Sequence, residues 1–189
     1  MTPQQQTYSL FVGVGLILVV ASVVGYVLKH SVAKDQPHAT IDNLNTRIKA
    51  WWVMVLVISL AFMFGDIGIT LLFTFVSWAA LREFTSVTTR GGDRAVLAAC
   101  FFVALPAQYL LVYFGWYGLY SIFIPAFAFL ALPIIIVATS DTTRFLERTA
   151  KMQWGLMISV FCISHVPALL TLNIPGYDDR NLLLIAFLV

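Results

Sequence analysis

Charge is the scarcest property of this sequence. Only 11% of its 189 residues are Asp, Glu, Lys or Arg, whereas an ordinary soluble domain carries about 25% charged residues. Hydrophobic residues make up 60% of the chain, and its mean hydropathy is +0.90. This is more apolar side-chain surface than a soluble fold of this length can bury. The composition therefore excludes a soluble globular domain and indicates an integral membrane protein.

Cysteine is also rare, because Cys100 and Cys162 are the only two in the sequence. Both fall inside long apolar runs. Two cysteines in such positions do not make a disulfide framework or a metal-binding spacing, so we predict that both are small packing residues.

Motifs that identify common enzyme classes are absent from the sequence. It has no phosphate-binding G-x-x-x-x-G-K-S/T, no H-E-x-x-H and no G-x-S-x-G. The apolar runs contain neither the paired acids of a proton relay nor a row of arginines for voltage sensing, which argues against a pump or a channel. The first seven residues lack the basic segment of a cleavable signal peptide, so the first apolar run is predicted to remain as a helix.

What the sequence does contain is a series of apolar runs close to bilayer length. They cover residues 8–28, 48–64, 67–81, 95–114, 119–138 and 153–172, and a further run starts at 182. Such runs are too long and too uniformly apolar for barrel strands, so they are predicted to be helices. We predict an all-α transmembrane bundle with six complete spans and the start of a seventh. The second and third runs are short and are expected to form a tight hairpin through Gly65, Asp66 and Gly68.

The basic residues predict the orientation of the bundle. Alternate loops place ten Lys and Arg residues on one side and only Arg180 on the other, and short cytoplasmic loops accumulate such residues. The N-terminus is therefore predicted to lie outside. The ten are Lys29, Lys34, Arg47, Lys49, Arg82, Arg90, Arg94, Arg144, Arg148 and Lys151.

Residues 29–50 form a basic connector between the first two runs. Ile41, Leu44, Ile48 and Trp51 recur at helical spacing, which predicts an amphipathic helix in the membrane interface that turns into the bilayer at Trp51 and Trp52. This helix either gathers anionic lipid or serves as a structural elbow, and the second alternative is favoured.

Some residues inside the spans are also informative. Gln108 and His165 are predicted to make hydrogen bonds between helices rather than to bind a ligand. Four prolines predict helix distortions, since neighbouring helices can satisfy the carbonyls that proline leaves unpaired. They are Pro106, Pro125, Pro133 and Pro167.

The stretch LREFTSVTTRGGDRA at residues 81–95 is unusual because it gathers three arginines and two acids between two apolar runs. One interpretation is that Arg82 and Glu83 only stop a span, while Arg90 and Arg94 obey the positive-inside rule. In the other, Arg82 contacts a lipid or nucleotide phosphate and Glu83 orients it, since a guanidinium fits phosphate oxygens with two prongs.

The third run ends in Trp-Ala-Ala-Leu-Arg-Glu-Phe at residues 78–84. This segment resembles the end of an early helix in the phosphatidate cytidylyltransferase (CDP-diacylglycerol synthase) family. The order of an anchoring helix, a basic connector, a short helix pair, the Arg-Glu loop and proline-containing helix pairs is also similar. The family's serine-proline-lysine-lysine-threonine-x-glutamate-glycine signature, with its metal-binding aspartates, occurs nowhere in residues 1–189.

The resemblance implies that the complete protein transfers a cytidylyl group from CTP to phosphatidic acid and uses Mg²⁺. Residues 1–189 would be its N-terminal transmembrane domain, with no catalytic or metal-binding residue, and the catalytic part is expected downstream because the sequence stops within an apolar run. The candidate substrate-binding residues are Arg82, Glu83, Arg90, Arg94 and Arg144.

The expected location is a bacterial inner membrane. The sequence gives no sign of nucleic-acid binding and leaves a homo-oligomer open. The competing interpretation is a non-enzymatic membrane protein, such as a transporter or a membrane assembly subunit.

Overall fold

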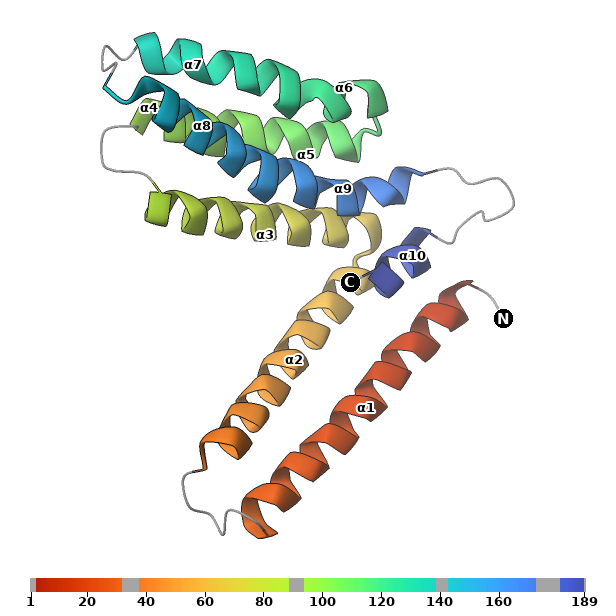
Figure 1. The fold of residues 1–189 in the computed structure, drawn as a ribbon. Helices are drawn as coiled ribbons and strands as arrows, with labels where there is room; N and C mark the ends of the chain where they lie inside the picture. The colour runs from red at the N-terminus through yellow and green to blue at the C-terminus, as the bar shows by residue number, and fades with distance from the viewer. Residues whose placement is uncertain (1–2, 32–37, 89–93, 139–142, 173–180, 189) are drawn as a thin grey trace. The chain divides into compact units, whose positions relative to one another are not determined.

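The computed structural model describes residues 3–31, 38–88, 94–138, 143–172 and 181–188, and the regular elements in these ranges are all helical (Figure 1). Six helical stretches are long and apolar enough to cross a membrane. This confirms the predicted all-α multi-pass architecture. The six stretches are Tyr8–Ser31, Ala39–Met63, Gly65–Thr88, Arg94–Tyr113, Tyr117–Ala138 and Phe145–Thr171. The last apolar run begins as helix α10, Asn181–Leu188.

The chain divides into two compact units. The first comprises Met1–Gly68 with Leu182–Val189, and the second comprises Ile69–Asn181. Helix α3, Gly65–Thr88, begins in the first unit and contributes most of its length to the second.

The first unit contains an antiparallel pair of helices, α1 (Pro3–Ser31) and α2 (Ala39–Met63). The rings of Phe11 and Phe62 meet edge to face at 5.2 Å near one end of the pair. At the other end, Lys29 Nζ lies 2.6 Å from Asp42 Oδ1. Between them, the Trp52 indole donates a hydrogen bond to Ser22 Oγ. Contacts along the whole length therefore hold the two helices together.

The expected elbow at Trp51 and Trp52 is wrong. Helix α2 continues from Ala39 to Met63 without interruption, so its polar first turns and its apolar remainder form one element. The reason is packing against α1, because Asp42 pairs with Lys29 and Asn45 Nδ2 donates to the Gly25 carbonyl oxygen. These contacts keep the polar segment in line with the rest of the helix.

Helices α2 and α3 are longer than the apolar runs suggested. They contain 25 and 24 residues, so each exceeds the roughly 20 residues that a perpendicular span needs. Only Phe64 separates them, and Gly65 begins α3 with a φ of +61°. A side chain is strained in that conformation, which explains the glycine.

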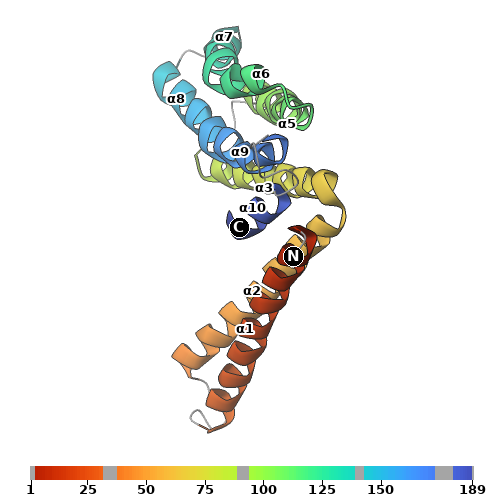
Figure 2. The same ribbon diagram turned by 90° about the vertical axis from the view of Figure 1, so that its right-hand side faces the viewer.

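The second unit packs α3 against three further spans, each built from several helical segments. Figures 1 and 2 show α3, α4–α5, α6–α7 and α8–α9 running beside one another. The segments are α4 (Arg94–Ala99), η1 (Cys100–Ala104), α5 (Leu105–Tyr113), α6 (Tyr117–Ile122), η2 (Phe123–Ala128), α7 (Phe129–Ala138), α8 (Phe145–Leu156), η3 (Met157–Cys162), α9 (Ile163–Ala168) and η4 (Leu169–Thr171). Their core includes Leu81, Val96, Cys100, Tyr109, Ile124, Ile136, Leu156 and Val160.

Three of these segments, η1, η2 and η3, are short π-helices within the spans. The η2 segment contains Pro125, whereas η1 ends two residues before Pro106 and η3 ends five residues before Pro167. Proline removes a backbone donor and crowds the carbonyl four residues earlier. The wider π turns accommodate that disruption at η1, which contains the carbonyl four residues before Pro106, and at η2, which contains Pro125; η3 ends before the carbonyl that Pro167 crowds, so Pro167 does not explain it.

Candidate functional site

The candidate residues Arg82 and Glu83 lie on α3, which continues for two turns beyond the predicted end of its span at Leu81. Both side chains are exposed. The Arg82 Cζ atom lies 5.7 Å from the centroid of the Trp78 ring, one turn earlier on the same helix. Consecutive helical residues do not face one another. Within the described ranges, no ion pair joins Arg82 to Glu83, so the structure does not show Glu83 orienting Arg82.

The other candidate arginines come from two further helices. Arg94 is the first residue of α4 and is exposed. Arg144 is the N-terminal cap of α8, with a left-handed φ of 50°. Its Nε atom lies 3.8 Å from Glu147 Oε2, and Glu147 Oε1 lies 2.7 Å from Lys151 Nζ. Arg144 therefore shares an acid with Lys151. Arg90 lies outside the described residues.

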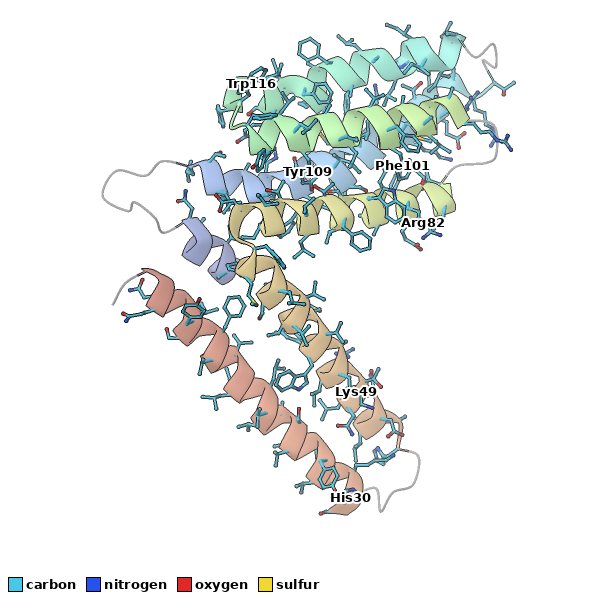
Figure 3. The ribbon with its side chains drawn as sticks, turned by 180° about the vertical axis from the view of Figure 1, so that it is seen from behind. His30, Lys49, Arg82, Phe101, Tyr109 and Trp116 are labelled. Atoms are coloured by element: carbon cyan, nitrogen blue, oxygen red, sulfur yellow. The ribbon has the colours of Figure 1, made fainter. Side chains whose placement is uncertain are left out.

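Topology brings these arginines to one end of the second unit. The end of α3, the start of α4, the end of α7 and the start of α8 lie together in Figure 1, and Figure 3 labels Arg82 at this end. We call this region, defined by Arg82, Arg94 and Arg144, the basic end. All three arginines are exposed; Arg144 pairs with Glu147, whereas among the described residues neither Arg82 nor Arg94 has a recorded carboxylate partner. Exposed guanidinium groups without a carboxylate partner, such as those of Arg82 and Arg94, are suited to contacting an anionic headgroup.

Trp78 is the residue of this region whose role sequence reasoning missed. Trp78 is 40% exposed, and its ring lies beneath the Arg82 guanidinium. Residues four apart on a helix are neighbours, so the spacing of Trp78 and Arg82 in the sequence already indicates that the guanidinium can lie over the ring.

Polar groups in the interior of the second unit have a structural role. The Gln108 side chain is fully buried, and its Nε2 atom donates to the Tyr120 carbonyl and to Ser164 Oγ, both at 3.1 Å. This confirms the interhelical hydrogen bond predicted for Gln108. The prediction for His165 is wrong, because its Nδ1 bonds the Phe161 carbonyl of the preceding turn in its own span. Cys100 and Cys162 are both free thiols. Cys100 is buried in the core, as predicted for a packing residue, whereas the prediction is wrong for Cys162, which is exposed.

The Mg²⁺ ion that the resemblance implies would need several oxygen ligands close together. Within the described ranges, no three His, Cys, Asp or Glu side chains gather closely enough to hold a metal ion. Among the described acids at the basic end, Glu83 and Glu147 are not part of such a ligand set. We therefore assign no chemical step in this segment to a metal ion.

The spans and the basic end define a multi-pass helical membrane protein with cationic groups at one end of its larger unit. Residues 45–189 match the sequence profile of the cytidylyltransferase family, and the chain belongs to that family. It is also 31% identical, over 157 residues, to a protein of Escherichia coli K12 described as uncharacterized protein YnbB. That match covers 81% of this chain and 49% of the relative, so the chain spans about half the length of the curated relative. No solved structure matches.

Proposed function

We propose that the complete protein transfers the cytidylyl group of CTP to phosphatidic acid, giving CDP-diacylglycerol and pyrophosphate. Membership of the cytidylyltransferase family carries this proposal. In the reaction, a phosphate oxygen of the lipid attacks the α-phosphorus of CTP. A new P–O bond forms as the bond to the β-phosphate breaks, and pyrophosphate leaves with the electron pair.

In this proposal, residues 1–189 supply the membrane scaffold and a cationic surface for the substrates. Both substrates carry several negative charges, so the reaction depends on positioning and on neutralising phosphate charge. The basic end offers guanidinium groups from three helices for this purpose, namely Arg82, Arg94 and Arg144. Arg90 and Glu83 remain candidates in the same segment of sequence. The lipid phosphate would meet these groups at the membrane surface.

The proposal places Mg²⁺ in the complete protein, where it would neutralise phosphate charge. Its ligands are expected in the downstream part, together with the catalytic residues. It also places the protein in a bacterial inner membrane, with the N-terminus outside and the basic end in the cytoplasm. The tenfold excess of basic residues in alternate loops supports this orientation.

The test is turnover by the purified complete protein in phospholipid nanodiscs, with radiolabelled CTP, phosphatidic acid and Mg²⁺. The expected product is labelled CDP-diacylglycerol, released with one pyrophosphate per turnover. Residues 1–189 alone, purified in the same way, should give no product. Failure of the complete protein to form product would refute the proposal and favour the non-enzymatic alternative, whereas turnover by residues 1–189 would show that the active site has been misplaced.

A further inference from the structure

The turn between α5 and α6 carries a cluster of exposed aromatic side chains. We call Phe114, Trp116 and Tyr117 the aromatic turn, and their exposed fractions are 65%, 61% and 72%. Figure 3 shows Trp116 at the end of the second unit opposite to Arg82 and the basic end. Neighbouring large rings that are exposed in this way mark an interaction surface.

The composition around the turn favours lipid over water as the material that surrounds it. No Asp, Glu, Lys or Arg occurs between Arg94 and Asp141, so the turn and the parts of the two spans beside it carry no charged side chain. Trp and Tyr combine an apolar ring with a polar N–H or O–H group, which suits them to the boundary between hydrocarbon and headgroups. The side chains of the turn are therefore those of a membrane interface.

The backbone of the turn is paired internally. The N–H groups of residues 114–117 all donate to carbonyl groups between Leu110 and Gly115, with N–O distances of 2.9–3.1 Å. Gly115 has a φ of +66°, which glycine adopts without strain and which lets the chain reverse between the two helices. Backbone donors that are paired in this way need no water, so the turn can lie where water is scarce.

The length of the preceding span places the turn at a definite depth. Tyr113, the last residue of α5, follows Arg94 by 19 residues, which corresponds to about 28 Å along a helix axis. The hydrocarbon core of a bilayer is about 30 Å thick. A span with Arg94 at one membrane surface therefore ends near the opposite boundary of the hydrocarbon. Only residues 114–116 separate it from the next span, which starts at Tyr117, so the turn is too short to carry its rings far into water.

We propose that the aromatic turn is a membrane anchor whose rings lie among the headgroups and ester groups of the phospholipid leaflet opposite to the basic end. The partner is the lipid surface itself rather than another protein. An anchor at this interface holds the span at a fixed depth and keeps Arg94 at the other membrane surface. The inference concerns the membrane alone and does not depend on the proposed function.

The test measures the depth of Trp116 by fluorescence in the complete protein, reconstituted in phosphatidylcholine nanodiscs. Phosphatidylcholines that carry bromine at shallow or deep acyl positions quench from the lipid, and iodide quenches from the water. Phenylalanine replaces every other tryptophan of the complete protein, including Trp51, Trp52, Trp78 and Trp154.

The matched control moves the single tryptophan to the basic loop predicted between α3 and α4, as Gly91→Trp with Trp116→Phe. Bromines close to the ester groups should quench Trp116 most strongly. Iodide should quench it about fivefold less than the control, because an interfacial indole is screened from aqueous ions.

A second measurement leaves all tryptophans in place, in case their replacement prevents folding. Tyr117→Cys, with Cys100 and Cys162 replaced by alanine, carries a nitroxide spin label, and Gly91→Cys in the same background is its control. Collisions with oxygen, which dissolves in lipid, should exceed those with a water-soluble nickel complex at Tyr117, whereas the nickel complex should dominate at Gly91.

Three outcomes would overturn the inference. Iodide quenching of Trp116 equal to that of the control, or nickel access at Tyr117 equal to that at Gly91, would place the turn in water. Strongest quenching by the deep bromines would place it in the hydrocarbon core. Weak quenching by both bromines and iodide would show that protein covers the turn, either a second copy or the downstream part of the chain.

Discussion

The Arg82 guanidinium carbon lies 5.7 Å from the centroid of the Trp78 ring, one turn earlier on α3. This distance is within the range of a cation–π interaction, which for an exposed pair contributes about 0.5–1 kcal/mol. The ring limits the positions that the guanidinium adopts while its hydrogen-bond donors remain directed to the surroundings. Arg82 is thus held in place at the basic end without a carboxylate partner among the described residues.

The first prediction separates a phosphate contact from a topological stop at Arg82. Arg82→Lys keeps the charge but removes the planar two-pronged donor set, which lysine cannot reproduce. If Arg82 binds substrate phosphate, turnover by the complete protein should fall about tenfold or more, equivalent to at least ~1.4 kcal/mol. Initial rates of CDP-diacylglycerol formation measure this.

The matched control is Arg47→Lys, an exposed arginine of α2 in the first unit, which should turn over normally. Glu83→Gln tests the second half of the assignment in the same assay. Normal turnover by both Arg82→Lys and Glu83→Gln, with normal insertion and folding, would mean that this segment only ends a span.

The number and type of the spans could be predicted from the sequence, because hydropathy over about 20 residues reports directly on membrane insertion. The residues at which the helices begin and end could not be predicted. Helix α3 continues to Thr88 since a charged residue ends an apolar run without ending the helix. At the start of α2, Asp42 accepts a hydrogen bond from the His38 N–H and pairs with Lys29 of α1; the second contact joins distant residues and is not contained in the local sequence pattern.

The candidate site, too, could be predicted only in part from the sequence. Loop arginines could be identified from composition, and topology then brought Arg82, Arg94 and Arg144 to one end of the second unit. The π-helical segments η1, η2 and η3 could not be predicted, because the sequence does not show which turn of a span widens. The prolines indicated which spans contain irregular helical segments, but not where in the span those segments lie.

The second prediction concerns orientation. A single cysteine at Gly91, with Cys100 and Cys162 replaced by alanine, should react with an impermeant maleimide only after the inner membrane is opened. The excess of basic residues in alternate loops is the reason. A cysteine at Gly176 is the comparison and should react in intact cells. The reverse pattern would invert the topology and remove the basic end from the cytoplasm.

The third prediction concerns a buried hydroxyl pair between α3 and α5. Tyr109 Oη donates to the Phe73 carbonyl at 2.8 Å and lies 2.6 Å from Ser77 Oγ. Because its one proton is used toward Phe73, Ser77 must donate to Tyr109. Tyr109→Phe removes both bonds and should lower the free energy of unfolding by about 1 kcal/mol.

Thermal unfolding of the purified protein in detergent measures this change. Tyr113→Phe, on the exposed side of the same helix, is the control and should leave the midpoint unchanged. Equal midpoints for the two variants would show that the Tyr109 pair does not stabilise the second unit.

The last prediction concerns the close contact between α3 and α8. A Cβ atom at Gly155 would lie 2.8 Å from two ring carbons of Phe84, closer than such atoms approach in proteins. Gly155→Ala should therefore destabilise the second unit by about 1–3 kcal/mol, the usual cost of overpacking. The control is Gly118→Ala, where nothing lies within 4 Å, and it reports the intrinsic helix effect of alanine alone.

A second substitution identifies the cause. Phe84→Leu removes the ring that the new methyl group would meet, so the double variant should recover much of the stability lost in Gly155→Ala. A double-mutant cycle on thermal unfolding gives the interaction energy between the two sites, which residues in contact should show and distant ones should not. Strict additivity would contradict the packing of Phe84 on Gly155.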